Sequence, residues 1–112
     1  MKKKTTNEIL EMAEEFCDKV WYNRHQNWIY RLEQGEEKIV KTEAETKNSD
    51  GTHNHKTTLM STFRQARKVA RDMEAKYGKK NLVWDDFEWG MINGKLSALR
   101  WVLGDEWDML DT

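Results

Sequence analysis

One segment, residues 86–104, limits the folds open to this chain more than any other part of it. The segment has the length and apolar content of a helix, yet Gly90 and Gly94 stand inside it. Each interior glycine costs about 1 kcal/mol relative to alanine. Gly90, Gly94 and Ala98 are spaced four residues apart and so share one helix face. We expect another helix backbone to lie close against this face; a ligand lying against the bare backbone is the alternative.

Bulky apolar residues accompany the glycines and also lie across the helix from them. The two sets are Phe87, Met91, Trp101 and Val102 beside the glycines, and Trp89, Ile92, Leu96, Leu99 and Leu103 opposite. A helix that is apolar nearly all round is normally buried on every side. We therefore predict that this C-terminal helix is the central one. Asp85 and Glu88 can cap its start, and Gly104 can end it.

Two further helices are predicted. Thr5 and Glu8 have the spacing of a capping box, at the start of a helix over about residues 6–34 that Gly35 ends. A second helix over about residues 58–77 follows from apolar positions spaced alternately four and three residues apart. These positions are Leu59, Phe63, Ala66, Ala70, Met73 and Tyr77.

Residues 36–57 lack helical periodicity and form an insert between the first two helices. Asn48-Ser49-Asp50-Gly51 is a strong turn signal. The sequence is compatible with a small β-hairpin within 38–57, with arms near 39–46 and 52–57. It is equally compatible with a flexible loop, because few large side chains are available to hold the arms down.

Composition supports a mainly α fold, which we predict to be a compact bundle of three helices in a single domain, residues 1–112. The chain has no proline, which fits a mostly helical chain, and six tryptophans, each able to bury about 200 Å² in a core. No stretch approaches the roughly 20 apolar residues of a membrane span. The basic start lacks the apolar run of a signal peptide. Because the single cysteine, Cys17, has no internal disulfide partner, we expect a cytoplasmic protein.

Polar and aromatic side chains gather most densely in the second half of the first helix. This polar–aromatic face consists of Trp21, Asn23, Arg24, Asn27, Trp28 and Arg31. Arginine and tryptophan are enriched in binding hot spots. Two interpretations stay open: a partner-binding surface, or a buried network that ties the helix to Glu88 or to the acidic C-terminal edge, which carries Asp105, Glu106, Asp108 and Asp111.

A basic stripe on the second helix is the other candidate surface. It consists of Arg64, Arg67, Lys68 and Arg71. Such a stripe could contact a nucleic-acid backbone. An ordinary solvated face is the simpler interpretation, because Asp72 and Glu74 flank the stripe and the formal net charge is only −1.

No catalytic, metal or cofactor site is predicted. His53 and His55, with Asp50 nearby, lack the further ligands that a zinc site needs. Cys17 lies in an apolar stripe and is expected to be a small buried hydrophobe. The carboxylate pairs that could hold magnesium in a helical nucleotide hydrolase all belong to one helix, so that activity is the weakest interpretation.

The C-terminal string over residues 89–112, from Trp89-Gly90 to Asp111-Thr112, resembles the C-terminus of small uncharacterised bacterial and phage-type helical proteins. The resemblance implies a bacterial or phage source and transfers no activity. We expect the apolar groups Trp107, Met109 and Leu110 to dock back onto the body as a short helical turn.

The leading functional hypothesis is a small non-enzymatic protein, an adapter or a regulatory inhibitor, that binds another protein. It would act through the polar–aromatic face and the acidic C-terminal edge. Nucleic-acid binding through the basic stripe is the alternative, and a metal-dependent nucleotide hydrolase is a third.

Overall fold

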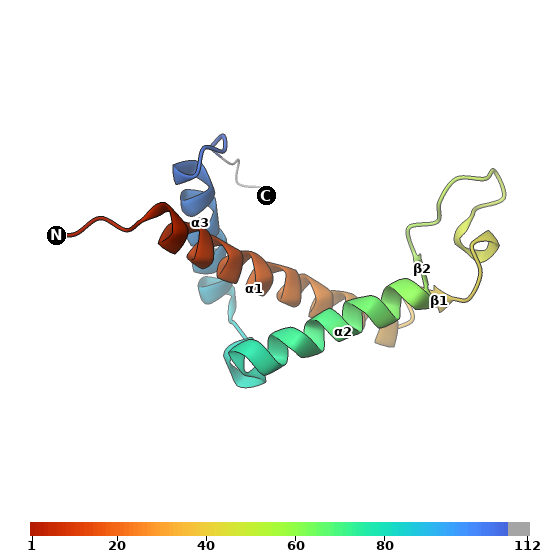
Figure 1. Cartoon of the computed structure of the whole chain (residues 1–112). Helices are drawn as coiled ribbons and strands as arrows, with labels where there is room; N and C mark the ends of the chain where they lie inside the picture. The colour runs from red at the N-terminus through yellow and green to blue at the C-terminus, as the bar shows by residue number, and fades with distance from the viewer. Residues whose placement is uncertain (108–112) are drawn as a thin grey trace.

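The computed structural model describes residues 1–107 of the chain (Figure 1). Its elements are, in order, α1 (Thr6–Glu33), β1 (Lys38–Val40), η1 (Ala44–Thr46), β2 (Thr57–Leu59), α2 (Met60–Tyr77), η2 (Lys79–Asn81) and α3 (Asp86–Val102). The prediction of a mainly α fold with three helices and a small strand insert is confirmed.

Both predicted capping boxes are present. The hydroxyl of Thr5 accepts a hydrogen bond from the backbone N–H of Glu8, whose carboxylate accepts one from the N–H of Thr5. Asp85 and Glu88 exchange the same pair of bonds at the start of α3. Gly78, with φ of 85°, ends α2 in a backbone conformation that L side chains rarely adopt. The helix boundaries therefore follow from local sequence signals.

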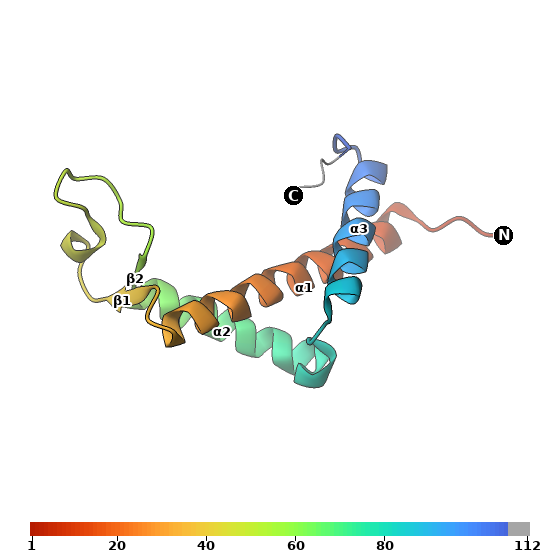
Figure 2. The same cartoon turned by 180° about the vertical axis from the view of Figure 1, so that it is seen from behind.

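The helix that contacts both of the others is α1, which corrects the expectation that the C-terminal helix is central. Val20 of α1 packs with Ile92 and Leu96 of α3 in one apolar cluster. Tyr22 packs with Ala70 of α2 in a second cluster. Within the described chain α2 and α3 make at most marginal contact. Figures 1 and 2 show why: α3 crosses α1 towards its N-terminal end, whereas α2 lies along its C-terminal half.

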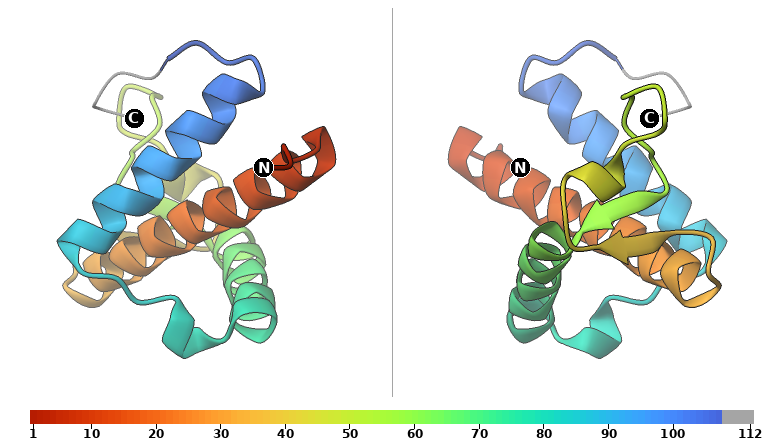
Figure 3. Two further views of the ribbon diagram at one scale, coloured as in Figure 1. Left: turned by 90° about the vertical axis from the view of Figure 1, so that its left-hand side faces the viewer. Right: turned by 90° about the vertical axis from the view of Figure 1, so that its right-hand side faces the viewer.

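The close approach expected at the glycines of α3 is also absent within residues 1–107. A Cβ atom built at Gly90 or at Gly94 meets no atom within 4 Å. Only one of the two apolar sides of α3 packs on α1, so these glycines face open space. The left panel of Figure 3 shows α3 crossing in front of α1 with no other element over it.

The insert contains a small parallel sheet, so the hairpin alternative, with arms near 39–46 and 52–57, is wrong. β1 and β2 run in the same direction, with Ile39 opposite Thr58. Parallel pairing needs a crossover of roughly a dozen residues or more, and residues 41–56 supply it. The predicted turn does form locally, where an isolated antiparallel bridge joins Lys47 to His53.

Candidate partner-binding groove

The aromatic half of the polar–aromatic face packs between α1 and α2. Trp21 stacks on His25 with ring centroids 4.9 Å apart. The ring of Trp28 lies 5.5 Å from that of His25 and 5.7 Å from that of Phe63 in α2. Both tryptophans are half-buried. They therefore contribute to helix packing, and the network interpretation fits this half of the face.

His25 is buried at 5% exposure and lies 3.1 Å, measured from Nε2, from Nη1 of Arg67. A guanidinium group only donates hydrogen bonds, so Nε2 accepts and the ring is neutral with its proton on Nδ1. Burial, and then the charge of Arg67, lower the pKa of His25. Arg67 therefore contacts α1, whereas the other cations of the basic stripe are exposed.

Two further polar contacts hold α1 to α2, and the sequence did not predict either. The hydroxyl of Tyr22 donates to Oε2 of Glu74 at 2.5 Å and accepts from Gln26 at 2.6 Å. The hydroxyl of Tyr77 donates to Oδ2 of Asp18 at 2.8 Å. Burial raises the pKa of the Tyr22 hydroxyl, and the carboxylate of Glu74 adds to the shift. The only signal in the sequence was that Glu74 and Tyr77 occupy one side of α2.

The polar residues of the polar–aromatic face differ in exposure and in their contacts. Arg24 and Asn27 are exposed and Asn23 is half-buried. The guanidinium of Arg31 donates from Nε to the carboxylate of Glu37, just beyond α1. Arg24 makes no hydrogen bond or ion pair with any residue of the described range 1–107. Arg24 is therefore the cation of this face that stays available to an outside group.

A groove of about 360 Å³ separates α1 from α3 beside Arg24. Its lining residues are Cys17, Val20 and Arg24 from α1, and Asn93, Leu96, Ser97 and Arg100 from α3. The side chains of Val20 and Leu96 are buried and make an apolar floor. The rim is polar, and Nε of Arg100 donates to Oδ2 of Asp105 at 3.0 Å.

Sequence reasoning placed only Arg24 of these lining residues in a candidate site. The available signal was the helical spacing of Asn93, Ser97 and Arg100 along one side of α3. Cys17 was expected to be buried, but its side chain is exposed at the groove. The apolar stripe that suggested burial is only partly covered, because α3 crosses α1 at an angle.

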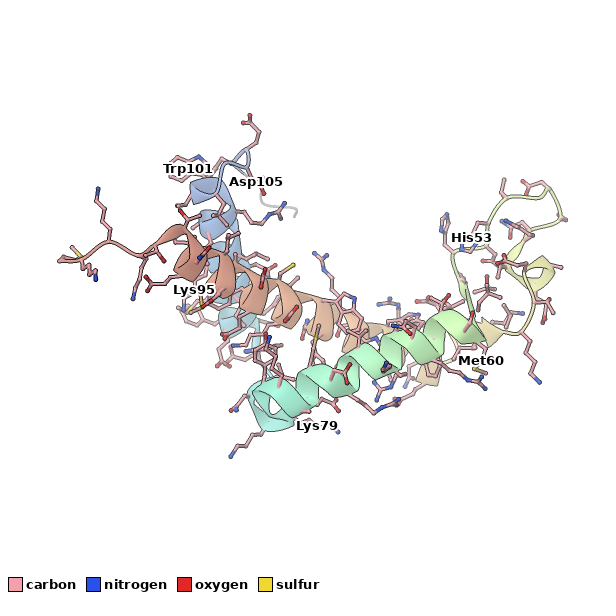
Figure 4. The ribbon with its side chains drawn as sticks, viewed as in Figure 1. His53, Met60, Lys79, Lys95, Trp101 and Asp105 are labelled. Carbon is pink, nitrogen blue, oxygen red and sulfur yellow. The ribbon has the colours of Figure 1, made fainter. Side chains whose placement is uncertain are left out.

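The histidine pair of the insert, which the sequence did not favour as a metal site, lies close together in the structure. The rings of His53 and His55 lie 5.3 Å apart in the insert, where Figure 4 labels His53. Asp50 accepts hydrogen bonds from the backbone and hydroxyl of Thr52, which lower the pKa of its carboxyl group. Among residues 1–107, no three histidine, cysteine, aspartate or glutamate side chains are close enough to hold a metal ion.

The acidic C-terminal edge is described only in part. Asp105 and Glu106 are exposed, whereas Asp108 and Asp111 lie outside the described residues. Trp107 packs edge-to-face on Trp101 at 5.3 Å, and the expected docking of Met109 and Leu110 likewise falls outside the described range. Among residues 1–107, the carboxylate of Glu88 caps α3 and takes no part in a network with α1.

No helix in the described part of the chain is both long enough and apolar enough to cross a membrane. The chain matches no protein-family model, no curated protein and no solved structure.

Proposed function

We propose that this chain is a small non-enzymatic protein-binding protein, an adapter or an inhibitor, and that its partner binds at the α1–α3 groove. One observation carries the proposal: exposed Arg24, without a partner among the described residues, lies beside a groove with an apolar floor. An apolar centre with a polar rim is the usual anatomy of a protein interface. Arginine beside such a centre is a common hot spot.

The groove chemistry defines the complementary surface. A guanidinium group binds carboxylates through two parallel hydrogen bonds. The floor formed by Val20 and Leu96 fits an apolar side chain, and the rim residues Asn93 and Ser97 can bind polar main-chain groups. The expected partner therefore presents an acidic residue next to an apolar one. Asn27, which is exposed three residues beyond Arg24 on α1, extends the same surface.

The test compares capture of host proteins by the tagged chain and by two charge-reversal variants, after nuclease treatment. Arg24→Glu should abolish specific capture, since it places a carboxylate where the partner's carboxylate must bind. Arg64→Glu makes the same charge change on exposed α2 surface and should leave capture intact. Thermal unfolding of both variants should match the parent. Equal capture by Arg24→Glu and the parent would contradict the proposal.

Nucleic-acid binding by α2 remains a second candidate because of one structural observation. Arg64, Lys68 and Arg71 are exposed and form no ion pair with any residue in 1–107. Glu74, which flanks them in sequence, is turned towards Tyr22. Three phosphate contacts predict that log affinity falls with log salt at a slope of about −3. A mobility-shift titration with duplex and single-stranded probes tests this, and no shift at low salt would exclude it.

A further inference from the structure

The side of α3 that faces away from α1 is apolar along its whole length. At about 100° per residue, one arc of roughly a third of the helix circumference contains no polar side chain. We call this arc the outer face; it consists of Phe87, Gly90, Met91, Gly94, Ala98, Trp101 and Val102. Phe87 is 76% exposed, Trp101 55% and Val102 56%. Continuous exposed apolar surface of this kind marks an interaction site.

Polar residues border the outer face and separate it from the side of α3 that packs on α1. Lys95 lies at one margin, with Nζ 5.9 Å from the ring of Phe16 in α1. Figure 4 shows Lys95 beside α1 and Trp101 at the far end of α3. Trp107, itself 61% exposed, packs against Trp101 and enlarges the apolar surface. Within residues 1–107 nothing covers this surface.

The chain exposes more surface than a folded monomer of its size should. Its accessible surface is 8737 Å², whereas roughly 6,500 Å² is typical of a compact monomer of this mass. The radius of gyration is 17.3 Å, against about 13 Å for a globular domain of this length. The excess of about 2,200 Å² is spread over the whole elongated chain, and it exceeds the roughly 800 Å² that each subunit buries in a stable dimer.

We infer that the outer face binds a second copy of this chain, with the two α3 helices packed antiparallel. Phe87, Met91, Gly94, Ala98 and Trp101 are spaced alternately four and three residues apart, which is the spacing of paired helices. Small residues occupy the middle of this seam and large ones its ends. In an antiparallel pair the small residues in the middle of one helix lie against those of the other, so the two backbones approach closely. Phe87 of one copy then packs near Trp101 of the other.

Charge favours the same orientation. The first turn of α3 carries Asp86 and Glu88, and its last turn carries Arg100. Arg100 is paired with Asp105 of its own chain, so the orientation follows from the helix dipoles, which oppose each other in an antiparallel pair. A parallel pair would bring the two acidic turns together. With a formal net charge of −1, the copies repel each other only weakly.

The first test is the molar mass of the full chain by light scattering and sedimentation over a wide range of concentrations, in reducing buffer because Cys17 is exposed. The expected mass is twice the 13.4 kDa of one chain. The double variant Met91→Glu/Trp101→Glu should be monomeric. Tyr30→Glu, which changes a 60% exposed aromatic on α1, is the matched control and should stay dimeric.

A second variant keeps the test decisive if the double variant misfolds. Gly94→Gln adds a Cβ atom that meets no atom within 4 Å in one protomer, so the variant should fold with unchanged helix content by circular dichroism and yet block the close approach of two helices. A parent chain that is monomeric at every concentration would overturn the inference. Dimers that persist in both Met91→Glu/Trp101→Glu and Gly94→Gln, when both variants are folded, would also overturn it.

Cross-linking tests the orientation. In a Cys17→Ser background, Phe87→Cys and Trp101→Cys chains are treated with a short bismaleimide, first separately and then mixed. Antiparallel packing predicts a cross-linked dimer only in the mixture, because position 87 of one copy lies near position 101 of the other. Cross-linking of either variant alone, with no gain on mixing, would refute the antiparallel arrangement.

Discussion

Replacing the two interior glycines of α3 by alanine should stabilise the isolated protomer. Gly90 and Gly94 both have helical backbone, and a Cβ atom at either position meets no atom within 4 Å. The added methyl groups therefore clash with nothing in the protomer. They remove the conformational freedom that glycine gives the unfolded chain. This expectation reverses the one drawn from the sequence, in which a close backbone neighbour made these glycines essential.

The size of the effect follows from helix propensity. Each substitution is worth about 1 kcal/mol, so the double variant should gain about 2 kcal/mol. An unfolding entropy of about 2.1 cal/mol/K per residue implies about 0.23 kcal/mol/K for a chain of this length. The melting temperature should then rise by about 8 °C.

The assay is thermal and urea unfolding followed by circular dichroism at the lowest workable protein concentration, where dimers dissociate. Gly35→Ala is the matched control. Its Cβ also meets open space, but its φ of +77° is unfavourable for alanine, so that variant should lose stability. As concentration rises, the gain of the glycine double variant should shrink, because the methyl groups obstruct the proposed dimer.

The opposite result would refute the reasoning. If the double variant were less stable than the parent at low concentration, a backbone would have to lie against Gly90 and Gly94 inside the protomer. The placement of α3 with its outer face open would then be wrong.

Two further predictions concern the α1–α2 interface. The pKa of His25 is lowered in the folded chain, so the unfolded chain binds a proton more readily. Stability should therefore fall as pH drops below the ordinary pKa of 6.5. Melting temperatures across this pH range should fall more steeply for the parent than for His25→Gln. Ala70 is fully buried against Tyr22, so Ala70→Leu should lower the free energy of unfolding by about 1–3 kcal/mol through overpacking. Ala75→Leu, on the exposed side of α2, is the control and should change the free energy of unfolding by less than about 0.5 kcal/mol. Urea unfolding measures both values.

The helix boundaries could be predicted because their causes are local. A capping box joins residues three apart, and a positive-φ glycine ends a helix whatever the rest of the molecule does. Thr5 with Glu8, Asp85 with Glu88, and Gly78 all act in this way. The other ends agree within one or two residues, and α2 starts at Met60 instead of 58 because residues 57–59 pair with β1.

The candidate site was less predictable because neighbouring positions on one helix face different surroundings. Trp21 and Trp28 pack towards α2, while Arg24 borders the groove with α3. The residue types indicated the polar–aromatic face, but they could not show which of its residues face α2 and which face the groove. The groove itself combines residues from two helices far apart in the chain, which no spacing within α1 reveals.

By itself, the sequence determined three helices, their ends, and the two apolar sides of the last one. Tertiary structure alone decided that α1 is the shared helix, that β1 and β2 run parallel, and that one apolar side of α3 stays open. The physical reason is that both sides of α3 carry large apolar side chains, so the local pattern favours burial of either one. The segment 78–85 carries α3 across the N-terminal half of α1, and that path selects the side that packs.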